Sequence, residues 1–220
     1  MRQFLRVSAV VALAILLGAA VTLAANTLEV SSPGLDGSNF KLEINTDGVD
    51  NSQKWVQDDS PECEATYNFE FGFRTPDLAA GELDLDDNYS VFLGRQVTGG
   101  ASNEIRCLLR SQPGGAFNPQ VRCSVREDNG MGGTRLRFIG QSAYNPSFEH
   151  SFRVELVKDT GLGDGSAIFY RDGVQVFSRN DLANDDRCWD AQRLGLGQPI
   201  PANSLGKAFE MDFDNFVSTR

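Results

Sequence analysis

The chain has 220 residues with 20 basic and 30 acidic side chains, which gives a formal net charge of −10. This acidity argues against nucleic acid or an anionic membrane as the partner, because both attract clustered lysine and arginine. Fifteen phenylalanines and a hydrophobic content of 40% argue against intrinsic disorder.

Residues 1–25 have the three parts of a secretory signal peptide. Arg2 and Arg6 form a basic start, an apolar run follows to Leu23, and small residues close the segment. We therefore predict an N-terminal signal helix that is removed near Asn26, an exported protein (periplasmic or extracellular), and no membrane insertion afterwards. An uncleaved anchor is the alternative, since the apolar run is nearly long enough to span a bilayer.

Residues 26–63 are polar and are predicted to be a loop-rich lead-in with one strand at 40–44. From Thr66 onward the hydrophobic period is two, as in strands that bury one face. The further predicted strands are 66–74, 89–95, 105–110, 121–126, 134–139, 152–158, 167–171, 174–178, 191–196 and 209–217. The expected inward side chains are Tyr67, Phe69, Phe71, Phe73, Phe152, Val154, Leu156, Phe209, Met211 and Phe213.

Four cysteines in an exported chain indicate disulfides, and four allow three pairings. Turn residues separate the strands that hold Cys107 and Cys123. If these strands form a hairpin, the two cysteines face each other and pair, which leaves Cys63 with Cys188.

Asp172-Gly173 is the strongest hairpin signal, because a type I′ turn needs positive φ at both positions. About eleven short strands between turns predict an all-β fold, an antiparallel two-sheet β-sandwich. Nothing marks a second domain, so residues 26–220 are predicted to form one unit.

The second half of the chain resembles a known superfamily. The segments that carry the resemblance are His150-Ser-Phe-Arg-Val-Glu-Leu-Val, Phe169-Tyr-Arg-Asp-Gly-Val and Phe209-Glu-Met-Asp-Phe-Asp-Asn-Phe-Val-Ser. They are similar to strands of concanavalin-A-like and laminin-G-like jelly rolls, over about residues 64–220 and most strongly over 150–218. The resemblance implies the jelly-roll fold and, by analogy only, glycan or surface biology, since its members include lectins, adhesion modules, hydrolases and lyases.

One acidic segment, Gly81-Glu-Leu-Asp-Leu-Asp-Asp87, resembles the catalytic strand of laminarinase-like glycoside hydrolases. Retaining hydrolysis needs two carboxyl groups about 5–5.5 Å apart. Glu82 and Asp84 match the signature, but Asp87 replaces the expected acid and neighbouring turn residues favour a solvated loop. We therefore expect no catalytic pair here.

Calcium is a candidate cofactor, because acidic loops offer hard oxygen ligands. The candidate ligands are Asp47, Asp50, Asp185 and Asp186, although solvated turns are the more ordinary use of such residues. His150 is the single histidine, and we interpret it as a turn or edge residue.

Trp55 and Tyr144 lie in turn-rich stretches and are candidate platforms for sugar rings, with packing at the end of the sandwich as the alternative. Arginines also recur on consecutive predicted strands: Arg106, Arg110, Arg122, Arg126, Arg135 and Arg137. They predict a basic stripe on one outward face. It either protects strand faces by charge or binds an anionic polysaccharide or a partner protein.

These observations favour a secreted, non-enzymatic module that binds a glycan or a surface component. The alternatives are a divergent polysaccharide-cleaving enzyme, hydrolase or lyase, that uses Glu82 and Asp84, and a purely structural envelope protein.

Overall fold

The computed structural model describes residues 25–59, 62–78, 82–98, 101–111 and 119–219. Its strands are β1 (Thr27–Ser31), β2 (Lys41–Asn45), β3 (Lys54–Asp58), β4 (Thr66–Arg74), β5 (Tyr89–Gln96), β6 (Ser102–Ser111), β7 (Pro119–Asp128), β8 (Thr134–Ala143), β9 (His150–Val157), β10 (Gly165–Arg171), β11 (Val174–Leu182), β12 (Ala191–Leu196) and β13 (Glu210–Thr219). One turn of 3₁₀ helix, η1 (Ala202–Ser204), precedes β13.

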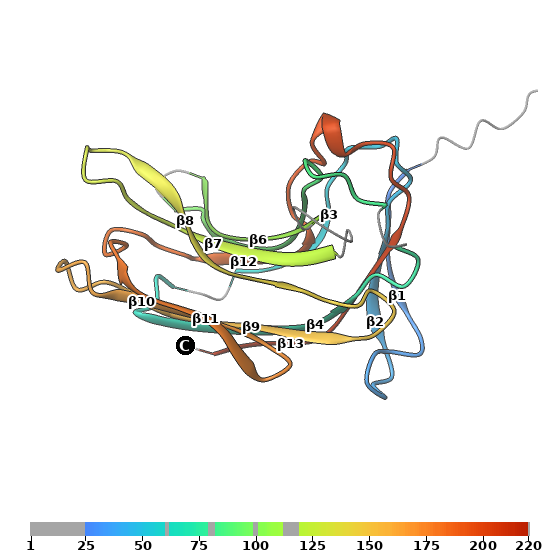
Figure 1. Cartoon of the computed structure of the whole chain (residues 1–220), viewed down its shortest axis with the longest axis horizontal. Coiled ribbons are helices and arrows are strands. Elements are labelled where there is room, and N and C mark those ends of the chain that lie inside the picture. Colours follow the sequence, from blue (N-terminus) through green and yellow to red (C-terminus); the bar gives the residue numbers. More distant parts are fainter. Residues whose placement is uncertain (1–24, 60–61, 79–81, 99–100, 112–118, 220) are drawn as a thin grey trace, which may run out of the picture.

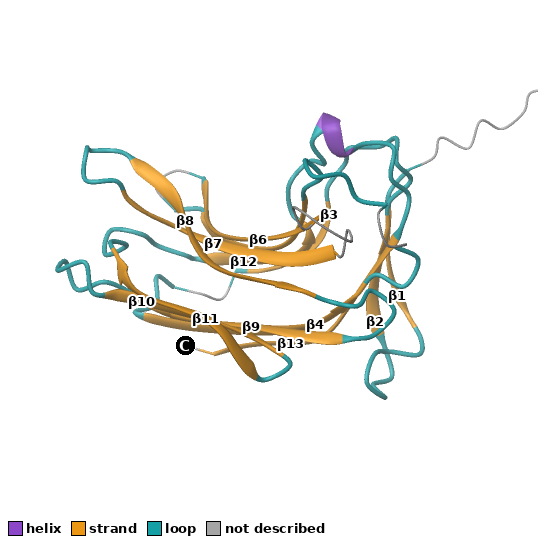
Figure 2. Cartoon of the chain, in the orientation of Figure 1, coloured by secondary structure: helices purple, strands orange, loops and turns teal. Residues whose placement is uncertain are grey.

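The strands form two antiparallel sheets that pack face to face, which confirms the predicted sandwich (Figure 2). The seven-stranded sheet has the order β1-β2-β13-β4-β9-β10-β11, and the six-stranded sheet has the order β3-β12-β5-β6-β7-β8. Within the described part of the chain, no helix is long and apolar enough to cross a membrane.

The core lies between the sheets and is rich in aromatic rings. Every side chain that alternation placed inward is buried. Phe69 of β4 stacks on Phe92 of β5 with 3.8 Å between ring centroids, so the two sheets touch through phenylalanine. Each buried phenylalanine contributes roughly 1.5–3 kcal/mol relative to an exposed one.

The lead-in differs from the prediction. Residues 26–63 contain three strands rather than one, because β1 and β2 extend the seven-stranded sheet and β3 forms an edge of the other. β1 and β3 have mixed, mostly exposed faces, so no regular alternation marks them in the sequence. The predicted signal peptide lies outside the described residues.

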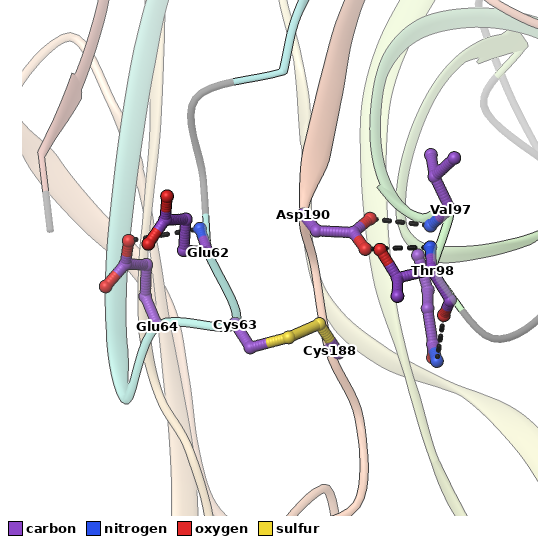
Figure 3. Close-up of a disulfide and its surroundings, with 8 residues drawn as sticks. Glu62, Cys63, Glu64, Val97, Thr98, Cys188 and Asp190 are labelled. Carbon is purple, nitrogen blue, oxygen red and sulfur yellow. Dashed lines mark hydrogen bonds between the residues drawn. A yellow bond between two sulfur atoms is a disulfide. The ribbon is translucent and has the colours of Figure 1, made fainter.

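Both predicted disulfides form. Cys107 and Cys123 are opposite each other in the β6–β7 ladder, and Cys63 bonds to Cys188 across 125 residues. Figure 3 shows the second bridge beside Asp190, whose carboxylate accepts hydrogen bonds from the backbone N–H groups of Val97 (2.5 Å) and Thr98 (2.8 Å). Disulfides are typical of exported proteins.

The six-stranded sheet curves, so that its outer face is concave (Figure 1). At one end the β7–β8 hairpin rises beyond the sheet, and at the other end the segment around η1 does so. This outer face carries four of the six predicted arginines: Arg106, Arg110, Arg122 and Arg126.

Candidate anion-binding face

Six arginines lie on the outer face of the six-stranded sheet. On β6, Ile105, Cys107 and Leu109 are in the core, so the residues that alternate with them point outward. We call the outward set the arginine face; its members are Arg95 of β5, Arg106 and Arg110 of β6, Arg122 and Arg126 of β7, and Arg193 of β12.

The ladder between β6 and β7 has the predicted register. Arg106 is opposite Ser124, Arg110 is opposite Gln120, and Arg122 is opposite Leu108. These three arginines were predicted to share a face, and the structure places them so.

Sequence reasoning missed Arg95 and Arg193. The β5–β12 ladder places Arg193 opposite Leu93, two residues from Arg95 on the same face. Both residues lie in strands that were predicted, so extending the alternation to 89–95 and 191–196 would have found them.

Two of the predicted basic residues do not join this face. Arg135 and Arg137 of β8 pair with the buried carboxylate of Glu127, at 2.7 and 3.5 Å, and Arg137 also contacts Asp181 of the opposite sheet. The stripe inferred from sequence was wrong at these two positions, because β8 sets them opposite the inward residues Val125 and Glu127.

The arginine face has almost no counter-charge. Only Arg126 has a carboxylate oxygen within 4.0 Å among the described residues, that of Glu104 at 3.8 Å. Three members have a buried Nε–H without a hydrogen-bond partner: Arg95, Arg106 and Arg110. The same holds for Nε of Arg137, Arg153 and Arg171 outside this face, so the missing carboxylates are what distinguishes the arginine face.

The arginines also lie close enough together for their positive charges to repel one another. Burial lowers the pKa of Arg106, Arg122 and Arg193, and a second arginine lowers each further. The second members of these pairs are Arg126, Arg110 and Arg95, respectively. All three pairs are diagonal neighbours in their ladders.

One end of the face is hollowed into a pocket of about 430 Å³. Its lining consists of two arginines, three amides and a turn: Arg95, Arg193, Gln53, Asn103, Gln198, Gly197 and Pro199. Gln198 also accepts a hydrogen bond of 3.0 Å from Arg106. Guanidinium groups bind carboxylates through two parallel hydrogen bonds, and side-chain amides can bond to hydroxyls. The lining therefore suits an acidic sugar.

Trp55 belongs to this site. Its ring lies 3.7 Å from the guanidinium carbon of Arg193, and its Nε1 donates to Gln53. Tyr144, the other predicted platform, is buried, and its hydroxyl bonds with Thr75 at 3.0 Å. The prediction that Tyr144 is a ligand platform was therefore wrong, because its ring packs against Phe73 and Phe152 in the core.

A second pocket of about 550 Å³ lies beside the Cys63–Cys188 bridge. Asp59, Glu62 and Asp190 are part of its lining. These three carboxylates give the pocket a negative charge, which disfavours an anion. The charge is opposite in sign to that of the arginine face.

Glu82 and Asp84 do not lie on a strand. They belong to the segment between β4 and β5, and Asp84 is exposed and pairs with Lys207 at 3.2 Å. The neighbouring Asp87 is buried, accepts a hydrogen bond from the Asp84 N–H, and has its pKa raised by burial. This segment is an acidic loop rather than a catalytic strand.

Three of the four predicted calcium ligands are engaged in local hydrogen bonds or ion pairs. Asp47 accepts from the N–H groups of Val49 and Asp50, and Asp186 pairs with Arg187. Asp50 bonds to Ser52, and Asp185 is exposed after β11. Calcium binding at these loops stays a prediction.

Elsewhere in the described residues, one cluster of three carboxylates has oxygens close enough to one another to hold a cation: Glu43, Glu210 and Asp212. The ammonium of Lys41 already lies among them, 2.6–3.2 Å from an oxygen of each. This cluster is a closed ion-pair network.

The single histidine and the four tyrosines of the chain all lie away from the arginine face. His150, on β9 of the other sheet, pairs with Asp172 at 2.9 Å. Tyr67, Tyr89 and Tyr144 are buried in the core, and Tyr170 stacks with Arg153 on the other sheet.

Comparisons with known proteins rest on the fold. No protein-family model matches the sequence, and no curated protein matches it. Among solved structures, the chain is similar to an endo-β-1,4-glucuronan lyase from the fungus Trichoderma reesei (TM-score 0.64, 12% identity, 88% of this chain and 86% of the other). It is also similar to an alginate lyase from Chlorella virus (0.52, 13%, 89% and 90%) and to a cellulose-induced protein (0.56, 9%, 89% and 86%).

These similarities show a shared β-sandwich fold. Most of these similar solved structures are lyases, which contradicts our expectation of a non-enzymatic module and favours the polysaccharide-cleaving alternative. The expectation failed for a chemical reason. It rested on the lack of a carboxylate pair, which hydrolysis requires, whereas elimination from a uronate requires groups that stabilise the negative charge developing on the substrate's carboxylate.

Proposed function

We propose that the protein is a polysaccharide lyase that acts on a polyuronate and binds it across the arginine face. The observation that carries this proposal is the set of six outward arginines, five of which have no carboxylate within 4.0 Å among the described residues. The lyases among its structural neighbours support the same reaction class.

Elimination breaks a glycosidic bond without water. The proton on C5 of the uronate leaves to a base, the C4–O4 bond breaks, and the departing oxygen takes up a proton. A double bond forms between C4 and C5. Negative charge develops on the carboxylate during proton removal, and fixed guanidinium groups aimed at it stabilise the transition state.

We assign carboxylate neutralisation to Arg95 and Arg193, because both line the pocket and neither has a carboxylate within 4.0 Å among the described residues. The amides of Gln53, Asn103 and Gln198 are placed to bind ring hydroxyls. Proton abstraction is assigned to no histidine or tyrosine, since all of them lie elsewhere. Exchange of His150 for alanine should therefore leave turnover unchanged.

The direct test is to incubate the purified protein with glucuronan and with alginate, and to follow the ultraviolet absorbance of the unsaturated uronate. Wild-type protein should produce this signal, and Arg193→Gln should lose most of it. Arg153→Gln is the matched control, because Arg153 is an arginine stacked on an aromatic ring of the other sheet. Absence of unsaturated product from every polyuronate tested would contradict the proposal.

A further inference from the structure

A second pair of arginines lies on the arginine face away from the pocket. Arg110 of β6 is opposite Gln120, and Arg122 of β7 is opposite Leu108. The two arginines are therefore diagonal neighbours, with about 7–8 Å between such positions on one face of a sheet. Neither contributes to the lining of the pocket.

Arg122 is held in place by an aromatic ring. Its guanidinium carbon lies 5.0 Å from the centroid of Phe138 on β8, and that ring packs edge-on against Phe177 at 5.0 Å. A cation stacked on a ring keeps its outer N–H groups available for a ligand. This arrangement repeats the stacking of Arg193 on Trp55 at the other end of the face.

The pair has no partner of opposite charge. No carboxylate of the described residues lies within 4.0 Å of Arg110 or Arg122, and the Nε–H of Arg110 is buried without an acceptor. Two half-buried positive charges side by side destabilise the free protein, because burial and like charge both disfavour them. An anion bound between them would offset both the burial of the charges and their mutual repulsion.

This pair is too far from the pocket for one sugar to reach both. Arg193 is on β12 and Arg122 is on β7, with β5 and β6 between them. Three inter-strand spacings of about 4.8 Å separate these strands by roughly 14 Å. Arg106, on β6, lies in the interval.

We propose that Arg110 and Arg122 form a second carboxylate-binding subsite, so that the face takes a run of consecutive uronates across its strands. This inference rests on the proposed function and narrows it. The substrate is then a polymer with repeated acidic units, and a single uronate or a chain with one acidic end is too short to use the whole face.

The test is binding of a length series of oligouronates, from disaccharide to hexasaccharide, measured by calorimetry on wild type and on the double variant Arg110→Gln/Arg122→Gln. The disaccharide should bind both proteins equally, in the pocket. The hexasaccharide should bind the variant more weakly, by roughly 10-fold for each charge-assisted hydrogen bond lost. Arg153→Gln should bind every length as wild type does.

Three results would overturn the second subsite. In the first two, the variant retains wild-type affinity at every length or loses the same factor at every length, while wild type still cleaves polyuronate; the proposed function then stands. If wild type neither binds nor cleaves any polyuronate, both proposals fail. Should the glutamine variant not fold, Arg110→Lys/Arg122→Lys replaces it. It keeps the charge but loses the paired hydrogen bonds, and a smaller loss confined to long oligomers is expected.

Discussion

The indole ring of Trp55 and the guanidinium of Arg193 lie against each other, with 3.7 Å between the ring centroid and Cζ. Three neighbours fix the same guanidinium: Nε donates to Gln57 at 2.6 Å, and Nη1 donates to the carbonyl of Gly197 at 3.4 Å and to the side chain of Gln53 at 3.5 Å. Its Nη2 has no hydrogen-bond partner among the residues that the structure describes. Arg193 is therefore held in one orientation with one nitrogen left for a ligand.

Trp55 is thus a positioning residue in our proposal, and its loss should weaken substrate binding. A cation–π contact of this kind contributes about 0.5–2 kcal/mol. We expect Trp55→Leu to raise KM for a polyuronate by roughly 3- to 30-fold, with Trp55→Phe closer to wild type because it keeps a ring. Steady-state kinetics on both variants check this. Equal KM values for wild type and Trp55→Leu would contradict it.

Binding to the arginine face should depend strongly on salt. Increasing NaCl from about 0.1 M to about 1 M shortens the Debye length from roughly 10 Å to 3 Å. We expect the affinity for a polyuronate to fall steeply over this range, since five of the six arginines have no carboxylate within 4.0 Å among the described residues. Titration calorimetry measures it. An affinity that does not change with salt would mean that the contacts are not ionic.

Glu82 and Asp84 should be dispensable for turnover. Asp84 is exposed and paired with Lys207, and the segment is a loop rather than a strand. We expect Glu82→Gln and Asp84→Asn to keep wild-type kcat/KM on any polyuronate that wild type cleaves. Loss of turnover in Glu82→Gln alone, with an unchanged melting temperature, would restore the carboxylate mechanism.

The two disulfides should differ in their contribution to stability. Cys63–Cys188 closes a separation of 125 residues, and Cys107–Cys123 closes one of 16. The chain-entropy model gives about 4–5 kcal/mol for the first and about 3 kcal/mol for the second. Urea unfolding of the two double-alanine variants compares them. The prediction fails if removing the long-range bridge has the smaller effect on the free energy of unfolding.

The sequence by itself determined the fold class, both disulfides and the inward faces of β4, β9 and β13. Alternation of period two is a local property, and burying one face of a strand dictates which residues enter the core. The hairpin between β6 and β7 likewise followed from its turn residues, and with it the shared face of Arg106, Arg110 and Arg122.

The tertiary structure decided which strands lie next to one another, and therefore where the arginines gather. Arg193 and Arg95 are distant in sequence and become neighbours only because β12 pairs with β5. Arg135 and Arg137 do not lie in the predicted stripe, because a bulge between β7 and β8 sets the register of that ladder. Both side chains form ion pairs with the buried carboxylate of Glu127 on the inward side. Strand order and bulges depend on long-range packing, which local periodicity does not encode.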